Sequence, residues 1–322
     1  MSKKIFVTGA AGFIGSNFVR YLFANGDDEV TVFDSLTYAG NPANLTEFEA
    51  NDRYKFVQGD VTDREAVRDA MRGHDLVVHF AAESHVDRSI EGPDVFVNTN
   101  CLGTNVVCDV AREVEVERLL HIGTDEVYGS IEQGSSLEGD PLEPRSPYSA
   151  SKAGSDLIAL SYFTTYEMPV VVTRSSNQFG PSQYPEKVIP LFTTNLLDGL
   201  QVPLYGDGLN IRDWLFVEDN CRAVDLVLRD GQPGELYNIG GGNEITNVEL
   251  TSRLLELCGK DESSIEYVAD RLGHDRRYSI DCSKVRDLGW APARDFGEAL
   301  ELTVEWYRDN RAWWEPLKNL PG

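Results

Sequence analysis

The feature that most constrains the fold is an alternation, in the first half of the chain, between short apolar runs and amphipathic stretches. Six runs read as strands separated by helical patterns: KIFVTG, EVTVFD, YKFVQGD, DLVVHFAA, RLLHIGT and MPVVVTRSS. Strands that are apolar on both faces and alternate with helices form a parallel sheet covered on both sides. The pattern therefore predicts a doubly wound α/β domain.

Beyond about residue 176 the pattern changes. The segments FGPSQYPEK, PLYGDGLNIRDW and YNIGGGNEIT carry Gly and Pro at short intervals, which favours short elements and turns. We expect a first domain over residues 1–176 and a smaller substrate-binding lobe over residues 177–322, with some return of the chain to the first domain.

The charge of the chain narrows the choice of partners. Its formal net charge of −24 argues against nucleic acid and against anionic membranes, since both are bound through clustered Lys and Arg. So acidic a surface favours solubility, and it would also suit a salt-rich cytoplasm. An anionic substrate would therefore need a local basic pocket.

The sequence also bears on location. No apolar run approaches the roughly 20 residues that cross a bilayer, and MSKKIFVTGAAG lacks the pattern of a signal peptide. The five cysteines are scattered and include no CxxC pair, which indicates neither a disulfide framework nor a zinc cluster. We expect a cytoplasmic protein with buried thiols and no metal.

Three glycines directly follow the first strand. Gly9, Gly12 and Gly15 have a GxxGxxG spacing that opens a helix, and a dinucleotide pyrophosphate needs such a tight turn, bare backbone and close helix packing. The second strand ends in Asp34, whose carboxylate can accept hydrogen bonds from ribose hydroxyls and would repel a 2′-phosphate. The pattern predicts an NAD site, with Asp60 placed near the adenine.

The segment YSASK places Tyr148 and Lys152 four residues apart, on one face of a helix. An ammonium beside a phenol stabilises the phenolate, so the tyrosine could act as a base near neutral pH. With the glycine pattern, this pair resembles the short-chain dehydrogenase/reductase superfamily and its Rossmann sheet. The length and second lobe resemble the extended branch, whose members act on nucleotide sugars. In that family a Ser or Thr at the end of the fifth strand completes the catalytic set, and Thr124 occupies this place.

Two carboxylates follow that threonine in LLHIGTDEVYGS. Removing a hydroxyl proton and passing a hydride to NAD needs no acid pair, so Asp125 and Glu126 indicate a second proton-transfer event. Neighbouring residues on a continuous strand point to opposite faces. Both carboxylates can therefore face one substrate only if the strand ends at Thr124.

Oxidation of a sugar at C4 would give such a pair a purpose. The C4 ketone acidifies the hydrogen at C5, so a base can remove it while an acid protonates the C6 hydroxyl and water leaves. The resulting C5–C6 alkene can take the hydride back at C6. This elimination requires that Asp125 holds a proton while Glu126 stays ionised.

Long segments over nearly the whole chain are similar to the dTDP-glucose 4,6-dehydratase family, in which a Thr-Asp-Glu triplet carries this elimination, with Asp as acid and Glu as base. The similar segments are DSLTYAGN, HFAAESHVDRSI, TDEVYGS, PLEPRSPYSASKAGSD, PEKVIPLF, PLYGDGLNIRDW and WYRDNRAWWEPLK. The resemblance implies conversion of dTDP-glucose to dTDP-4-keto-6-deoxyglucose. Because this chemistry is redox-neutral overall, we expect NAD to be regenerated in each turnover and retained through purification. It also implies a homodimer formed by helices at residues 95–114 and 149–166.

The resemblance assigns further residues to the site. Around NAD it places Phe13, Ile14, Asp34, Leu36, Thr37, Asp60, Val61, Ala81, Ala82, Thr99, Tyr148 and Lys152. It implies that Ser84 and Thr124 hold the glucose hydroxyls. Around the nucleotide and diphosphate it places Asn177, Lys187, Tyr205, Arg212, Asn247, Arg271 and His274. The cations in this set agree with the needs of a diphosphate.

The chain departs from the family in two places. It has Asn177, Gln178 and Phe179 where the family usually reads Asn-Asn-Tyr, and it has Leu272 in DRLGHD where the family has a proline. Two alternative functions stay open. A 4-epimerase or decarboxylase of the same branch would not need the acid pair, and a non-catalytic NAD-binding redox sensor would not need the Tyr, Lys and Thr set.

Overall fold

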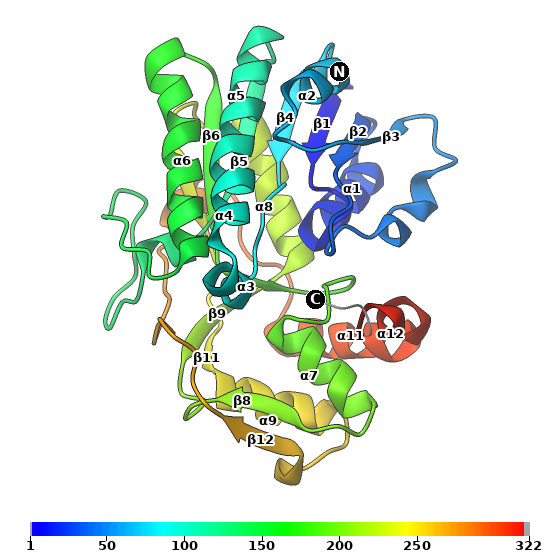
Figure 1. Cartoon of the computed structure of the whole chain (residues 1–322), viewed down its shortest axis with the longest axis vertical. Helices are drawn as coiled ribbons and strands as arrows, with labels where there is room; N and C mark the ends of the chain where they lie inside the picture. The colour runs from blue at the N-terminus through cyan, green and yellow to red at the C-terminus, as the bar shows by residue number, and fades with distance from the viewer. Residues whose placement is uncertain (1, 319–322) are drawn as a thin grey trace.

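The computed structural model describes residues 2–318 and has two lobes (Figure 1). The larger lobe is built on a seven-stranded parallel sheet with the order β10-β6-β5-β4-β1-β2-β3. Its strands are β1 (Lys4–Thr8), β2 (Glu29–Asp34), β3 (Tyr54–Gln58), β4 (Leu76–His79), β5 (Arg118–Thr124), β6 (Val170–Ser175) and β10 (Leu236–Ile239). The six strands predicted from the sequence are present, so the doubly wound α/β fold is confirmed.

Helices cover both faces of this sheet. One face carries α2 (Arg64–Met71), α5 (Thr104–Glu113) and α6 (Pro147–Tyr166), and the other carries α1 (Phe13–Asn25) and α8 (Val217–Asp230). Side chains alternate along a strand. In β1, accordingly, Ile5 and Val7 pack with α1 and α8, whereas Phe6 packs with α2 and α5. Burial on both faces explains the continuous apolar runs.

The chain returns to the larger lobe late in the sequence. Strand β10 pairs with β6 through the register Leu236 to Val172, and α8 packs beside α1. From the sequence this stretch was expected to be rich in turns, because the four residues of β10 are followed directly by three consecutive glycines. The strand forms because its four residues are buried, a property that depends on the neighbouring β6.

The smaller lobe lies beneath the carboxyl ends of the strands in Figure 1. It contains a three-stranded sheet of β7 (Asn177–Phe179), β9 (Ile211–Phe216) and β11 (Glu244–Thr246), and a pair of β8 (Val202–Tyr205) and β12 (Ile265–Val268). Its helices are α7 (Val188–Leu197), α9 (Asn247–Leu257), α11 (Phe296–Asp309) and α12 (Arg311–Lys318). The short helix α10 (Ser283–Asp287) packs on β10 of the larger lobe.

The helix expected over residues 95–114 is present but is not uniform. After α3 (Val86–Glu91), it runs through α4 (Pro93–Phe96) and a π-helical segment (Val97–Gly103) into α5. Gly103 lies close to the loop after β3, where an added Cβ would be 2.7 Å from Val61 Cγ2. Apolar periodicity does not reveal such a π segment, which often marks a functional site.

Two further observations bear on the predictions. Cys108, Cys221 and Cys282 are buried, but Cys101 and Cys258 are only half-buried, so the prediction of five buried thiols was wrong for two of them. Among residues 2–318, no helix combines the length and the apolar character needed to span a membrane.

Candidate active site

Two adjoining cavities lie at the carboxyl edge of the large sheet, where ligands of doubly wound folds bind. The first has a volume of about 410 Å³ and the second about 500 Å³. Both are lined by Glu126, Asn177, Gln178, Gln183, Tyr184, Glu186 and Lys187. The two cavities therefore adjoin along these residues, and together they make up one candidate site.

The structure brings nearly all the predicted site residues to these cavities. The first is lined by Gly9, Gly12, Phe13, Ile14, Gly15, Asp34, Thr37, Asp60, Val61, Ala81, Ala82, Ser84, Thr99, Thr124, Asp125, Glu126, Tyr148 and Lys152. The second is lined by Tyr205, Arg212, Asn247, Arg271 and His274. Leu36 lies outside the lining of both cavities, and its backbone N–H donates to Asp34 Oδ1 at 2.8 Å.

The glycine turn has the shape that a dinucleotide needs. Gly9 has a φ of +69°, and a Cβ there would lie 2.5 Å from the backbone nitrogen of Ala81. A Cβ at Gly15 would lie 2.6 Å from Ala10 Cα, so this glycine lets α1 pack closely on β1. The first turn of α1 faces the first cavity, where its N–H groups can bind a pyrophosphate.

Asp34 is anchored at the end of β2. Its Oδ2 accepts a hydrogen bond from the backbone N–H of Ala11 at 2.9 Å, while its Oδ1 accepts one from Leu36. Burial raises the pKa of this carboxyl, and the two backbone donors oppose that shift. Because a carboxylate offers about four lone-pair positions, Asp34 can still accept the ribose hydroxyls of a bound cofactor.

A helix residue that the sequence reasoning missed fixes the loop after β4. Asn100, in the π-helical segment, accepts a hydrogen bond from the backbone N–H of Glu83 at 2.8 Å and donates to its carbonyl at 3.0 Å. Its side-chain nitrogen also donates to Ser151 Oγ on α6 at 2.8 Å. Asn100 thereby holds the loop that carries Ser84 against the catalytic helix, a role that only the fold reveals.

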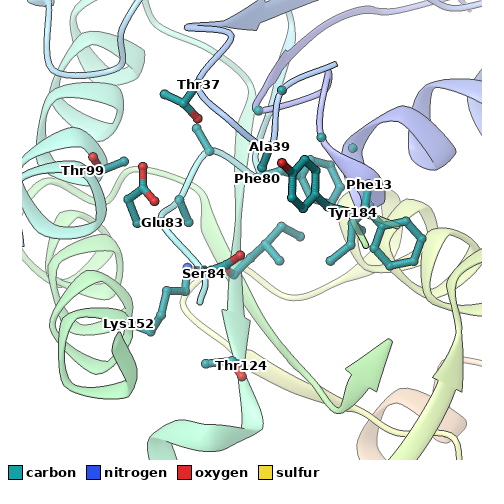
Figure 2. A pocket seen from close by; sticks show the side chains of 18 of the residues that line it. Phe13, Thr37, Ala39, Phe80, Glu83, Ser84, Thr99, Thr124, Lys152 and Tyr184 are labelled. Atoms are coloured by element: carbon teal, nitrogen blue, oxygen red, sulfur yellow. Dashed lines mark hydrogen bonds between the residues drawn. The ribbon is translucent and has the colours of Figure 1, made fainter. Parts of the chain in front are cut away.

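Strand β5 ends where the sequence predicted. Thr124 is the last extended residue, and Asp125–Tyr128 form a 3₁₀ turn. The Thr124 hydroxyl accepts a hydrogen bond from the backbone N–H of Glu126 at 3.3 Å and donates to Asp125 Oδ1 at 3.3 Å. The break in the strand lets both carboxylates line the first cavity (Figure 2 labels Thr124 at this position).

The two carboxylates lie in different electrostatic environments. Burial, followed by the charges of Glu126 and Asp213, raises the pKa of Asp125 well above its ordinary value. Burial also raises the pKa of Glu126, but Arg271 and Lys187 oppose that shift. The arrangement favours a protonated Asp125 beside an ionised Glu126, which is the division of roles needed for acid and base.

Tyr148 and Lys152 stand near the start of α6, which begins with a capping box between Ser146 and Ser149. Figure 2 shows Lys152 extending from α6 toward the cavity. Its Nζ donates to the carbonyl of Ile122 at 2.6 Å. Lys152 therefore bonds to β5, and it lies on the same face of α6 as Tyr148.

The expected effect of this lysine on the tyrosine needs a correction. Burial, followed by the charge of Glu126, raises the pKa of Tyr148 above its ordinary value, and the Thr124 hydroxyl opposes the shift. The protein's own groups therefore favour the neutral phenol over the phenolate. A further positive charge at the site would be needed to lower its pKa.

The second cavity carries the local positive charge that an anionic substrate would need. Its cationic side chains are Arg88, Lys187, Arg212, Arg271 and Lys318, against the carboxylates Asp87, Glu126 and Glu186. The Arg212 guanidinium is held by the carbonyl of Asp275 at 2.9 Å and lies 4.3 Å from the centre of the Tyr278 ring. These fixed cations contrast with the acidic composition of the chain.

Residues 183–187, which we call the strap, form the wall between the cavities. Glu186 Oε1 accepts a hydrogen bond from Tyr38 Oη at 3.1 Å, and its Oε2 accepts one from Arg88 Nε at 3.1 Å. Lys187 Nζ donates to the carbonyl of Ser84 at 2.8 Å. The strap is thus fastened to two loops of the larger lobe. The sequence reasoning missed Glu186, because its partners are distant in the chain.

Several polar atoms in the cavity walls keep unused hydrogen-bonding capacity. Within residues 2–318, the buried atoms without a hydrogen-bond partner include Asp125 Oδ2, Asn177 Oδ1, Gln178 Oε1, Gln183 Oε1 and Arg271 Nε. Buried polar groups are normally satisfied, so these atoms indicate a polar ligand. Together with the glycine turn and Asp34, they fit a dinucleotide beside a polar substrate.

The departures from the family pattern have different settings. Gln178 keeps a side-chain amide and lines both cavities. Phe179 packs in the core of the smaller lobe against Trp214. Leu272 is 78% exposed and lies outside the lining of both cavities. Neither Phe179 nor Leu272 contributes to the cavity walls.

Comparison with known proteins places the chain in a family. The model of the GDP-mannose 4,6 dehydratase family matches residues 6–303. The dTDP-glucose 4,6-dehydratase of Streptomyces antibioticus is 56% identical, over 99% of this chain and 96% of that protein. A crystal structure of DesIV, a dTDP-glucose 4,6-dehydratase from Streptomyces venezuelae with NAD and TYD bound, is 56% identical and superposes with a TM-score of 0.96 over 98% of this chain and 99% of that one.

A more distant structural relative belongs to the same branch. The Thermus thermophilus UDP-glucose 4-epimerase in complex with NAD has a TM-score of 0.89 and 32% identity, over 95% of this chain and 99% of that one. The fold is therefore shared with epimerases, and the much higher identity with the dehydratases decides between them. The chain belongs to the dTDP-glucose 4,6-dehydratase family.

Proposed function

We propose that this protein converts dTDP-glucose to dTDP-4-keto-6-deoxyglucose, as an NAD-dependent hydro-lyase. The observation that carries the proposal is the turn at the end of β5, where a carboxyl favoured in its protonated form and a carboxylate line the same cavity as Tyr148 and Lys152. The names of the similar proteins support dTDP-glucose as the substrate.

The residues of the first cavity fit NAD, which is bound in the crystal structure of the DesIV relative. The turn of Gly9, Gly12 and Gly15 would hold the pyrophosphate, and Asp34 would hold the adenosine ribose. When bound, NAD supplies a hydride acceptor that later returns the hydride, and in its oxidised form it adds a positive charge to the site.

In this proposal, the proton transfers belong to the protein's own side chains. Tyr148 takes the proton of the C4 hydroxyl, and Thr124 orients that hydroxyl. Glu126 then removes the proton at C5, which the C4 ketone has made acidic, and Asp125 gives its proton to the C6 hydroxyl so that water leaves. After this step Glu126 holds a proton and Asp125 is ionised, so the net charge of the pair is unchanged.

The second cavity would bind the nucleotide and diphosphate. Lys187, Arg212 and Arg271 supply cations for the diphosphate oxygens, and Tyr205, Asn247 and His274 would contact the nucleotide. On this basis we assign NAD binding chiefly to the first domain and nucleotide-sugar binding chiefly to the smaller lobe. We further propose a cytoplasmic homodimer, consistent with free cysteines and with exposed apolar residues on α6.

The test is to incubate the protein with dTDP-glucose and to identify the product by mass spectrometry and NMR. We expect a 4-keto-6-deoxy sugar, formed with the loss of one water. Formation of the C4 epimer without water loss would instead establish an epimerase and would overturn the proposal. UDP-glucose serves as the comparison substrate, and we expect slower turnover with it.

Two variants separate the half-reactions. The double variant Asp125→Asn with Glu126→Gln should lose product formation by on the order of 100- to 10,000-fold, while bound NADH and a 4-keto-glucose intermediate accumulate. Tyr148→Phe should block both product and NADH, since no later step can begin without the ketone. Product formation by the double variant at close to the native rate would show that the carboxylates are structural.

A further inference from the structure

A buried charge cluster lies behind the catalytic face of α6. Asp156 stands four residues after Lys152 and is 0% exposed. Its Oδ2 accepts a hydrogen bond from Arg174 Nε on β6 at 2.8 Å, and its Oδ1 lies 3.3 Å from His121 Nε2 on β5. Such a buried charge is costly unless paired, so its presence next to the active site calls for an explanation.

A glycine in β5 gives this carboxylate its place. A Cβ added at Gly123 would lie 2.8 Å from Asp156 Oδ1, so a larger residue would displace the carboxylate. The preceding residue of the strand, Ile122, offers the carbonyl that accepts from Lys152 Nζ. Lys152 and Asp156 are also on one face of α6. Both side chains therefore meet β5 at adjacent residues.

Only one of the two carboxylate oxygens of Asp156 is paired with a cation. Arg174 binds only Oδ2, and Oδ1 has no hydrogen-bond partner among residues 2–318. His121 faces Oδ1 at 3.3 Å, but burial lowers the pKa of this histidine and so disfavours its charged form. Lys152 in turn is 5% exposed and lies one helical turn before Asp156 on the same face of α6.

We propose that Asp156 is a positioning residue of the active site. Its buried carboxylate fits beside β5 because residue 123 is a glycine, and Arg174 fixes it there. In this position the carboxylate holds Lys152 in its ammonium form. This inference rests on the proposed function for its catalytic meaning, since the ammonium is needed at the site only if Tyr148 is the base. The carboxylate acts through the lysine and itself stays behind the cavity wall, outside its lining.

The electrostatics agree with this geometry. Burial lowers the pKa of Lys152, and Asp156 is the strongest influence in the opposite direction. Removing the carboxylate charge should therefore let Lys152 lose its proton at a lower pH. The other charged and titratable groups on the elements packed around it are Cys101, His79, His121, Arg174, Asp125, Glu126 and Tyr148.

The experiment follows the protonation of Lys152 directly. Lysine labelled with ¹³C at Cε is introduced into the full chain as purified, and the Lys152 signal is identified by its absence in Lys152→Arg. A pH titration by NMR then gives the titration midpoint of this side chain without substrate. The readout does not depend on turnover, so the proposed function can fail separately, in the assay with dTDP-glucose.

Four variants make the test specific. Asp156→Asn keeps the shape and removes the charge, but it leaves Arg174 buried without its partner and can fail to fold. The double variant Asp156→Asn with Arg174→Gln removes both charges and is compared with Arg174→Gln alone. Ser155→Ala is the control, because it removes a neutral hydrogen bond to His121, 3.1 Å long, from the same turn of α6.

We expect the midpoint of Lys152 to move to lower pH in Asp156→Asn, and in the double variant relative to Arg174→Gln, while Ser155→Ala leaves it in place. A double variant that folds and keeps the midpoint of Arg174→Gln would overturn the proposal and leave Asp156 as a purely structural partner of Arg174. An equal shift in Ser155→Ala would also overturn it, because the effect would then not come from charge.

Discussion

Asp125 shows how a single residue can serve the reaction at the expense of stability. Its carboxyl is 2% exposed, its Oδ2 has no hydrogen-bond partner within residues 2–318, and its pKa is raised by burial and by neighbouring carboxylates. In the unfolded chain the same group is ionised at neutral pH. Folding therefore requires Asp125 to take up a proton, and this requirement becomes more costly as the pH rises.

Replacing Asp125 with Asn should remove this requirement. Between the unfolded and folded pKa values the native state binds the extra proton, so the free energy of unfolding falls with rising pH, by about 1.4 kcal/mol per pH unit from this group alone. We expect Asp125→Asn to be more stable than the native protein at neutral pH, with a difference that shrinks toward acidic pH. Urea unfolding across a pH series measures it.

The control for this measurement is Asp52→Asn, at an exposed position outside the lining of both cavities. This variant should unfold like the native protein at every pH. A pH-independent difference between Asp125→Asn and the native protein would contradict the linkage, since it would point to packing and not to the proton.

The site residues predicted from the sequence share one property: each was recognised from residues close to it in the chain. Thr124, Asp125 and Glu126 follow a strand directly, and Tyr148 and Lys152 share a helix face, so spacing alone placed them near one another. Glu186, Asn100 and Asp156 gave no such signal. Each acts through partners that lie on other elements, and those pairings arise only when the chain folds.

At the scale of elements, the strap links the two lobes over the cofactor cavity. Tyr38, in the loop after β2, and Arg88, in α3, both bind Glu186, and the Arg88 guanidinium lies 3.8 Å from the centre of the Tyr38 ring. On the other side, Tyr184 Oη donates to the carbonyl of Leu317 at 3.4 Å. The strap is therefore held at both ends.

Weakening this fastening should speed the release of NAD. Glu186→Gln loses the charge in two hydrogen bonds, each worth about 1.5–3 kcal/mol when one partner is ionised, so NAD dissociation should rise on the order of tenfold or more. The rate is measured by the loss of bound NAD after dilution and gel filtration. Glu256→Gln, on the exposed face of α9, is the matched control. Equal NAD retention in both variants would show that the strap does not hold the cofactor.

The elements themselves were predicted to different degrees. Six strands of the large sheet were evident because each contains a short run rich in apolar residues. Strand β10 was missed, since it is short and its burial depends on β6, and the π-helical segment was missed because an added residue in one turn leaves the composition unchanged. Sequence patterns thus located the elements whose burial is regular.

At the scale of the whole molecule, an apolar face is left on the side formed by α5 and α6, which lie side by side in Figure 1. Leu157 is 59% exposed and Tyr166 55%, while Leu102, in the adjoining π-helical segment, is 46% exposed. Exposed apolar residues on neighbouring helices are typical of contacts between subunits. This face is the one expected to form the dimer.

Light scattering should therefore give about twice the chain mass of 35.9 kDa at micromolar concentration. Leu157→Asp, which places a charge in the contact, should shift the protein toward the monomer. Leu200→Asp changes a leucine of similar exposure, 54%, in the smaller lobe and should leave the dimer intact. A native protein that scatters as a monomer would contradict the prediction.

The wall shared by the two cavities has a consequence for the protein's place in metabolism. In the proposed reaction, substrate and product would exchange through the second cavity, while the strap, fastened at Glu186 and Tyr184, would keep NAD in the first. Bound NAD would then be reduced and reoxidised within each turnover, and no oxidant would be drawn from the cell. The turnover rate of such an enzyme would not depend on the ratio of free NAD to NADH in the cell. It would therefore be the same in a starved cell as in a growing one.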